Sequence, residues 1–257
     1  MFQGRGVIVY LTTTNAVAQR INEERLERLQ GKEKVYEGTM TGDFSEKDLP
    51  TDVWLRLKKG AQVMLLNNDS WGRWVNGTIG RVRDFERDGI EDVIILELEG
   101  GEEVEVRPYT WDMFEFYYDK EENRIATRSI GSFTQLPLRL SWAITIHKSQ
   151  GLTFDRVVID IGQGTFAHGQ VYVALSRCRT LEGIILQRPL LKRHILMDRS
   201  VVRFLTEYRY SIAAEAMPLE ERLKLLEEAR ERGQMLAMVY LKNTDEKTQR
   251  IIIPLEV

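Results

Sequence analysis

Thiol and imidazole side chains are scarce in this chain of 257 residues. It has one cysteine, Cys178, and three histidines, His147, His168 and His194. A single cysteine excludes an intrachain disulfide and a thiolate metal cluster, and the histidines lack the spacing of zinc ligands. We therefore expect no metal site, and the lack of disulfides fits a reducing, cytoplasmic setting of the bacterial type.

Long apolar runs are also missing. No stretch approaches the ~20 consecutive apolar residues that cross a bilayer, and the first residues do not begin an apolar signal segment. Hydrophobic residues make up 43% and charged residues 29% of the chain, which is typical of globular proteins without membrane contact. The length exceeds the commonest size of a single domain, so we expect two compact units and a tail.

The net charge of −3 argues against a simple binder of polyanions, but the charge is unevenly distributed. Residues 57–135 carry 10 basic and 16 acidic side chains, a net charge of −6. Residues 136–212 carry 11 basic and 5 acidic side chains, a net charge of +6. Either this is chance patchiness, or residues 136–212 face a polyanion.

The two ends of the first 200 residues have the pattern of an α/β sheet. An apolar strand over 6–11 precedes a Thr/Asn loop and a helix over 16–29, for which that loop supplies an N-cap. Apolar strands return at 156–161 and 183–186, with a helix over 169–179 between them.

The middle and the tail differ from this pattern. Short strands and frequent turns fill residues 57–135, including hairpins at 93–106 and 114–127, and they predict a small β-barrel inserted into the α/β domain. In the tail, Pro218 starts a predicted helix that Gly233 ends, and two strands follow.

Two segments combine polar and apolar residues in a way that indicates chemistry. They are Ala143-Ile144-Thr145-Ile146-His147-Lys148-Ser149-Gln150-Gly151-Leu152-Thr153-Phe154-Asp155 and Gly169-Gln170-Val171-Tyr172-Val173-Ala174-Leu175-Ser176-Arg177-Cys178-Arg179. The first offers several hydrogen-bond donors, the charge of Lys148, and a glycine, Gly151, that lets backbone N–H groups approach an anion. It predicts a phosphate-binding loop; the alternative is a polar loop that satisfies its own backbone.

Arg177 and Arg179 lie at the end of the expected helix over 169–179. One interpretation is that they interact favourably with the C-terminal end of that helix. The other is that one of them is an arginine finger, which stabilises the charge that develops on a γ-phosphate.

Both segments resemble the late motifs of superfamily-one helicases, in particular of the RecD and PIF-type branch. Thr145-Ile146-His147-Lys148-Ser149-Gln150-Gly151 is similar to the fifth motif of that family, and Tyr172-Val173-Ala174-Leu175-Ser176-Arg177 to the sixth. Three further strings resemble its fourth-motif region and the entry to its inserted barrel: Leu11-Thr12-Thr13-Thr14-Asn15 with Ile21-Asn22, Leu57-Lys58-Lys59-Gly60-Ala61-Gln62-Val63-Met64-Leu65, and Val75-Asn76-Gly77-Thr78-Ile79-Gly80. The resemblance covers about residues 7–190.

The resemblance implies a fold. Residues 1–56 and 136–212 would form the second RecA-like domain of a helicase, a parallel sheet with flanking helices. Residues 57–135 would be an inserted small barrel that is similar to Src-homology-three (SH3) domains. Residues 213–257 would be a linker helix and a hairpin that resemble the start of a WYL domain, on the strings Ala229-Arg230, Leu236-Ala237-Met238-Val239-Tyr240 and Arg250-Ile251-Ile252-Ile253-Pro254-Leu255.

The resemblance also implies roles for single residues. Arg177 would be the arginine finger, and Gln150 and Gly151 would lie beside the nucleotide. The single-strand path would be lined by Thr13, Asn15, Thr145, His147, Lys148 and Ser149. Base stacking and plain core packing both stay open for Trp71, Trp74 and Trp142.

By this resemblance the chain is the C-terminal motor half of an ATP-dependent 5′-to-3′ DNA helicase that serves DNA repair, replication or recombination. ATP and Mg²⁺ would bind between it and an N-terminal P-loop RecA-like domain, and single-stranded DNA would be its other partner; we expect a monomer. No Gly-x-x-x-x-Gly-Lys-Ser/Thr string occurs in the chain, so we expect no ATP hydrolysis by it alone. The rival interpretations are a non-enzymatic nucleic-acid-binding or regulatory protein, and a nucleotide-binding enzyme unrelated to DNA.

Overall fold

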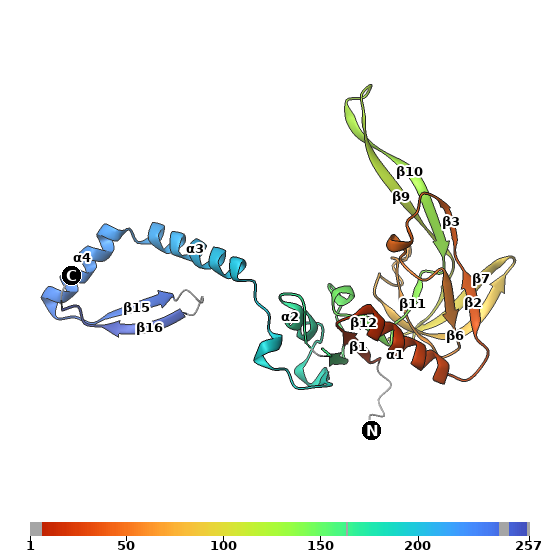
Figure 1. Ribbon diagram of the computed structural model, residues 1–257, viewed down its shortest axis with the longest axis horizontal. Coiled ribbons are helices and arrows are strands. Elements are labelled where there is room, and N and C mark those ends of the chain that lie inside the picture. The colour runs from red at the N-terminus through yellow and green to blue at the C-terminus, as the bar shows by residue number, and fades with distance from the viewer. Residues whose placement is uncertain (1–6, 163, 242–246, 256–257) are drawn as a thin grey trace. The chain divides into compact units, whose positions relative to one another are not determined.

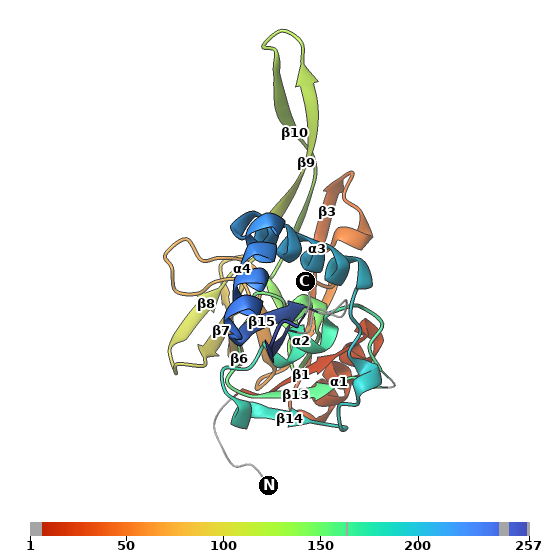
Figure 2. The same ribbon diagram turned by 90° about the vertical axis from the view of Figure 1, so that its left-hand side faces the viewer.

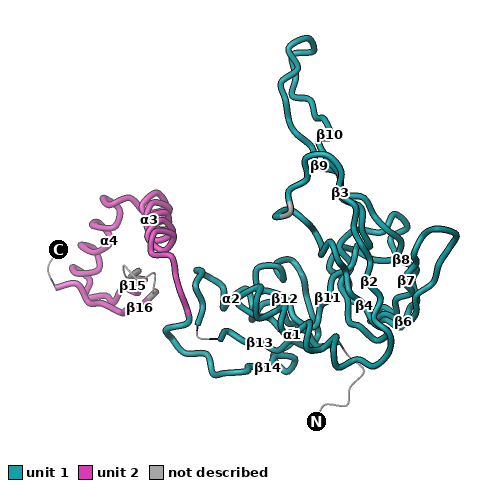
Figure 3. The backbone as a smooth tube through the Cα atoms, turned by 45° about the vertical axis from the view of Figure 1, so that its right-hand side comes forward, with its two compact units in different colours: residues 1–194 teal, residues 195–257 magenta. Residues whose placement is uncertain are grey.

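The computed structural model describes residues 7–162, 164–241 and 247–255. The chain divides into two compact units, residues 1–194 and residues 195–257, which we describe separately (Figure 3). Among the described residues, no helix has the length and apolar character needed to cross a membrane.

A four-stranded parallel sheet forms the α/β part of the first unit, and Figure 2 shows its strands β1, β13 and β14. Its strands, in spatial order, are β12 (Ala143–Thr145), β1 (Val9–Thr12), β13 (Val157–Asp160) and β14 (Ile184–Leu186). All three pairings are parallel, and both neighbours of β1 lie more than 130 residues further along the chain. The expected α/β domain with a parallel sheet is therefore confirmed, and it is built from both ends of the unit.

Helix α1 (Asn15–Arg28) follows β1 directly. The side chain of Thr14 accepts a hydrogen bond from the Val17 amide and so caps its first turn, as the Thr/Asn loop predicted. The side chain of Asn22 donates to the carbonyl of Ala143 at 2.8 Å and accepts from its amide at 2.8 Å. These two bonds fix the helix to strand β12.

The inserted part is all β. A five-stranded antiparallel sheet has the order β11-β5-β6-β7-β8, with β11 (Leu138–Leu140), β5 (Gln62–Leu65), β6 (Ile79–Asp88), β7 (Glu91–Leu98) and β8 (Glu103–Val106). Side chains of this sheet and of neighbouring segments form one hydrophobic core. It includes Leu55, Leu57, Val63, Leu65, Val82, Ile94, Leu96, Val106, Leu136 and Leu138. The likeness of this part to SH3 domains stays a prediction.

The predicted boundaries of the insert at residues 57 and 135 need correction. Strands β2 (Lys34–Glu37) and β4 (Trp54–Leu57) pair with each other, and β3 (Thr39–Gly42) pairs with β10 (Arg124–Gln135) of the insert. At the other end, β11 pairs with β5. Strand pairing therefore extends the β part to about residues 34–140. The sequence did not indicate this, because these strands have only three or four residues and their partners are distant along the chain.

A long antiparallel hairpin projects from the insert (Figures 1 and 2). It consists of β9 (Tyr109–Asp119) and β10 (Arg124–Gln135), whose register shifts between Ser129 and Gly131. At its base, Phe133 is fully buried and stacks on Trp111 at a centroid distance of 5.9 Å. The hairpin predicted at 114–127 is thus confirmed, and its strands extend beyond that range at both ends.

The second unit contains α3 (Arg199–Ala216), α4 (Leu219–Arg232) and a hairpin of β15 (Leu236–Leu241) and β16 (Lys247–Ile252). Helix α4 starts after Pro218 and ends at Gly233 in a left-handed conformation, as the sequence predicted. The predicted boundary at residue 213 needs correction, because it falls inside the continuous helix α3. The chain divides after residue 194 instead.

Candidate functional site

Two polar loops meet where parallel strands end. In the sheet, Thr12 at the end of β1 lies opposite Thr145 at the end of β12. The chain continues from Thr12 into Thr13 and Asn15, and from Thr145 into a 3₁₀ turn, η2 (His147–Ser149). Ligands of open α/β sheets bind at the carboxyl ends of the strands, so this edge is the expected place for a site.

The loop that follows β12 is held from inside by its own polar groups. The amide of Lys148 donates to Thr145 Oγ1 at 3.3 Å, and the amide of Ile146 donates to the Thr12 carbonyl at 2.9 Å. Gly151 has a φ of +82°, and an added Cβ would meet nothing within 4 Å. A ligand can therefore approach the backbone closely at Gly151.

The predicted loop residues differ in exposure. Asn15, His147, Lys148, Gln150 and Gly151 are exposed. Of these, Asn15 and Lys148 line one pocket together with Thr145. His147 instead faces Phe166, at a ring centroid distance of 5.7 Å.

The predicted role of Ser149 in lining the single-strand path needs correction. Its side chain is fully buried, and its hydroxyl donates to the Ile146 carbonyl at 2.7 Å. Serine hydroxyls often bind a backbone carbonyl three or four residues earlier, and the tight turn η2 brings that carbonyl into reach. The side chain therefore stabilises the loop from inside and is not available to a strand.

Arg177 joins the two segments that the sequence singled out. Its Nη1 donates to the carbonyl of Leu152 at 2.9 Å and, more weakly, to that of Ser149 at 3.4 Å. Its Nε donates to the Val173 carbonyl at 3.0 Å. The contact with Val173 is the predicted interaction with the end of a helix, and the contacts with Leu152 and Ser149 fix the guanidinium beside the polar loop.

The helix that precedes Arg177 is shorter than the predicted range of 169–179. Helix α2 (Gln170–Leu175) ends before Arg177, because the next residues pair with Phe154. The amide of Phe154 donates to the Arg177 carbonyl at 2.8 Å, and the amide of Arg179 donates to the Phe154 carbonyl at 3.1 Å. This extended pairing ends the helix and aligns Arg177 with the polar loop. Arg179 forms an exposed ion pair with Asp155 at 3.0 Å.

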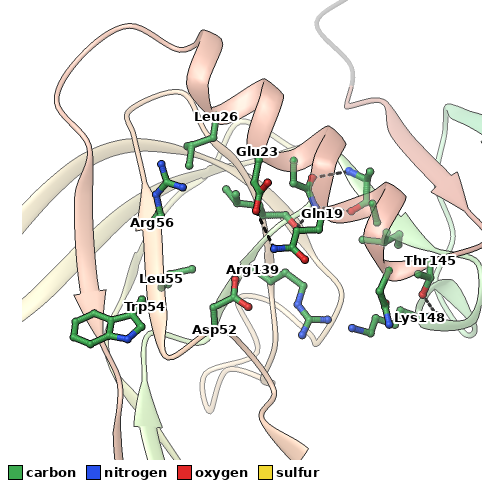
Figure 4. A pocket seen from close by; sticks show the side chains of 16 residues that line it. Gln19, Glu23, Leu26, Asp52, Trp54, Leu55, Arg56, Arg139, Thr145 and Lys148 are labelled. Atoms are coloured by element: carbon green, nitrogen blue, oxygen red, sulfur yellow. Dashed lines mark hydrogen bonds between the residues drawn. The ribbon is translucent and has the colours of Figure 1, made fainter. Parts of the chain in front are cut away.

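The pocket at this edge is open and has a volume of about 200 Å³ (Figure 4). It lies between α1, β4, β11 and β12. Most of its lining residues were not among the predicted site residues, and these include Arg139 on β11 and Trp54 on β4. The alternation Trp54-Leu55-Arg56-Leu57, with both leucines buried, was the signal that Trp54 points outward.

The electrostatics of the pocket are those of crowded cations. The pKa of Lys148 lies below its usual value, first because the pocket walls partly remove its ammonium from water and second because of the nearby charge of Arg139. Burial also lowers the pKa of Arg139, and Asp52 opposes both shifts. An anion bound here would remove the mutual repulsion of the two cations.

The three tryptophans with open roles have different surroundings. Trp74 is buried, and its indole N–H donates to Asn67 Oδ1 at 3.2 Å. Trp142 packs against the core of the insert. Core packing therefore accounts for these two, whereas Trp71 is 87% exposed and does not line the pocket.

The insert touches the polar loop at Gly77. The φ of Gly77 is +95°, and an added Cβ would lie 2.2 Å from Leu152 Cδ2. Gly77→Val is therefore expected to push Leu152 away and to loosen residues 149–152, where the Leu152 amide bonds to the Ser149 carbonyl at 3.0 Å. Hydrogen exchange at Leu152 is expected to accelerate.

The matched control is Gly72→Val. Gly72 also has a positive φ, +74°, but open space surrounds its Cβ position. Both variants carry the strain of a left-handed side chain, about 1–2 kcal/mol, and only Gly77→Val disturbs the loop. Equal exchange at Leu152 in the two variants would refute the contact.

Comparison with known proteins places this site in a family context. Residues 140–184 match the family described as the UvrD-like helicase C-terminal domain. The chain is 36% identical over 198 residues to the ATP-dependent DNA helicase Pif1 of Bdellovibrio bacteriovorus, which covers 74% of this chain and 41% of that protein. It is 40% identical over 168 residues to human ATP-dependent DNA helicase PIF1, covering 63% of this chain and 24% of the human protein.

Solved structures agree. Unliganded Pif1 from Bacteroides sp. superposes with a TM-score of 0.69 at 38% identity, covering 79% of this chain and 45% of that one. Bacteroides Pif1 bound to single-stranded DNA superposes with a TM-score of 0.63 at 38% identity, covering 79% of this chain and 46% of that one. The chain spans less than half the length of the relatives named here. In sequence and in fold, it is similar to the C-terminal part of Pif1-type helicases of superfamily one.

Proposed function

We propose that this chain is the C-terminal motor half of an ATP-dependent 5′-to-3′ DNA helicase, in which it grips single-stranded DNA and supplies the arginine finger. The observation that carries the proposal is that the Lys148 loop, which begins at the carboxyl edge of the parallel sheet, is joined to the Arg177 turn by the bond from Arg177 to the Leu152 carbonyl. The relatives named above are ATP-dependent DNA helicases, which does not favour the non-enzymatic alternative. The 5′-to-3′ direction rests on family likeness alone.

The nucleotide would bind on the side of Gly151 and Arg177. The open backbone at Gly151 and the fixed guanidinium of Arg177 fit a γ-phosphate that approaches from a partner domain. The described residues contain no group of three or more His, Cys, Asp or Glu side chains that could hold a metal ion, so ligands for Mg²⁺ would come from the P-loop domain. When bound, Mg²⁺–ATP supplies the energy that drives closure of the two domains.

The strand would bind on the side of Asn15 and Lys148. Asn15 is the exposed first residue of α1, where the helix dipole favours anions, and Lys148 carries a charge at the rim of the pocket. The excess of basic residues over 136–212 adds a long-range attraction for the strand.

Other parts of the proposal rest on likeness in sequence. The inserted strands would form an SH3-like barrel, and the second unit would be the start of a WYL domain. The protein would act as a monomer in a bacterial-type cytoplasm, with an N-terminal P-loop domain as its partner within the helicase.

Binding of single-stranded DNA is the direct test. We expect the affinity of the 257-residue chain for a fluorescent oligonucleotide to fall with salt, because each phosphate contact releases a counterion. Lys148→Ala is expected to weaken binding and to reduce the slope of log K against log salt by about 0.7. Fluorescence anisotropy at several salt concentrations measures both effects.

A pH series gives a second signature of Lys148. Because its pKa is lowered in the free protein, the ammonium loses its proton at a lower pH than an ordinary lysine does. We therefore expect binding to weaken as pH rises through that lowered pKa, and Lys148→Ala to remove this dependence.

The control is Lys120→Ala. Lys120 is exposed in the turn between β9 and β10, outside the pocket. If the two substitutions weaken DNA binding equally, Lys148 has no specific role in binding the strand. If the unaltered chain does not bind DNA at low salt, the proposed grip is contradicted.

A further inference from the structure

The pocket has walls from both parts of the first unit. Strand β12 and helix α1 belong to the α/β part, whereas β4 and β11 belong to the inserted β part. Its volume of about 200 Å³ is below the ~300–1,000 Å³ of clefts that enclose drug-sized ligands. A site of this size and openness suits a short piece of a longer chain.

Two cations share one side of this pocket. Arg139 is held in place because its Nη2 donates to the Pro50 carbonyl at 2.6 Å. Figure 4 shows Arg139 and Lys148 on the same side, with Asp52 beside Arg139. Within the described part of the chain, the ammonium of Lys148 has no hydrogen-bond partner. Asp52 supplies one negative charge beside these two positive charges. A bound anion would neutralise the positive charge that remains.

The remaining charged groups of the pocket do not meet that demand. Arg56 is committed to Glu33, with bonds of 2.7 and 3.0 Å. Glu23 accepts a bond of 2.9 Å from Gln19 on helix α1, and Figure 4 shows this pair on the wall away from Trp54. The anion site is therefore confined to the side of Arg139 and Lys148.

An exposed indole lies on the other side. Trp54 is 58% exposed at the start of β4, and Figure 4 shows it across Asp52 from Arg139. An exposed aromatic face next to a phosphate site is how proteins bind single strands without reading their sequence, because every base has a face that stacks.

We propose that this pocket holds one nucleotide of the bound strand, with its phosphate between Arg139 and Lys148 and its base stacked on Trp54. The inference rests on the proposed function and adds Arg139 and Trp54, both on strands of the inserted β part, to the DNA-binding residues. The insert then grips the strand together with the α/β part, because both supply walls of one site.

The test compares two strands of about 12 nucleotides, oligothymidine and a strand of the same length with abasic residues. Trp54→Ala is expected to weaken binding of oligothymidine about tenfold and to leave binding of the abasic strand unchanged. Arg139→Gln is expected to weaken binding of both strands and to reduce the salt slope, because it removes a phosphate contact. Anisotropy titrations of the full chain measure all of these.

Matched controls separate the pocket from its surroundings. Trp71→Ala removes an indole that is more exposed but lies outside the pocket. Arg56→Gln removes a pocket arginine that is bonded to Glu33. Both are expected to bind like the unaltered chain. Arg139→Lys keeps the charge and is expected to keep the salt slope, and thermal melts check that Arg139→Gln is folded.

The outcomes are distinguishable. If the unaltered chain binds neither strand, the proposed function and this inference both fail. If it binds, and Trp54→Ala and Arg139→Gln bind equally well, the strand lies elsewhere and this inference alone is overturned. If Trp54→Ala weakens binding of the abasic strand as much as that of oligothymidine, stacking on Trp54 is refuted.

Discussion

Arg177→Ala is expected to lower ATP turnover by about 10³–10⁵-fold in an enzyme that unites this chain with its P-loop domain. The guanidinium is held by the carbonyls of Val173 and Leu152 at 3.0 and 2.9 Å, and its Nη2 donates to Ser176 Oγ at 2.9 Å. A guanidinium fixed before ATP arrives needs little reorganisation to meet a γ-phosphate. Steady-state ATPase assays with saturating DNA measure the loss.

The same bonds predict a structural effect that must be separated from the chemical one. Loss of the Arg177 contacts is expected to cost about 1–3 kcal/mol of stability, because hydrogen bonds from a charged donor are among the stronger ones. A purely structural role would let turnover recover at lower temperature, where the variant is folded. A finger that contacts the phosphate would leave turnover low in a fully folded variant.

Arg179→Ala is the matched control for Arg177. Its ion pair with Asp155 is exposed on both sides, and such pairs contribute less than about 1 kcal/mol. We expect little change in stability or turnover. If Arg177→Ala keeps its ATP turnover, or if Arg179→Ala loses as much turnover as Arg177→Ala, the arginine finger is assigned to the wrong residue.

Phe133→Ala is expected to destabilise the first unit by about 3–5 kcal/mol. The ring is fully buried at the base of the β9–β10 hairpin, with Phe44 at 6.0 Å and Trp111 at 5.9 Å between centroids. An added Cβ on Gly38 would lie 2.6 Å from the Phe133 ring, so backbone also packs closely against it. Truncation leaves a cavity that these neighbours cannot fill without moving strands, and urea denaturation measures the cost.

Phe114→Ala is the control for Phe133. Phe114 lies on β9 of the same hairpin and is 55% exposed, so its removal is expected to change stability by no more than about 0.5 kcal/mol. Similar losses in the two variants would show that the base of the hairpin is not packed as described.

Features that depend on neighbouring residues could be predicted from the sequence of this protein. Short apolar runs predicted β1, β13 and β14 of the parallel sheet, and the N-cap in the Thr/Asn loop and the Gly233 end of two helices were placed correctly. These features depend on residues within a few positions of each other. For the same reason, the string from Thr145 to Gly151 pointed to the loop that begins at the carboxyl edge of the sheet.

The tertiary structure decided which distant residues meet. Ser149 carries a hydroxyl that could bind a ligand, but the 3₁₀ turn directs this hydroxyl inward to the Ile146 carbonyl. Trp54 and Arg139 lie about 85 positions apart and have unremarkable neighbours, yet the fold places them around one pocket. A sequence pattern records which face of a strand is buried, whereas the partner across that face follows from the packing of the whole unit. The sequence by itself therefore determined the elements and the chemistry of the loops, and only the packing of the insert on the α/β part brought the walls of the pocket together.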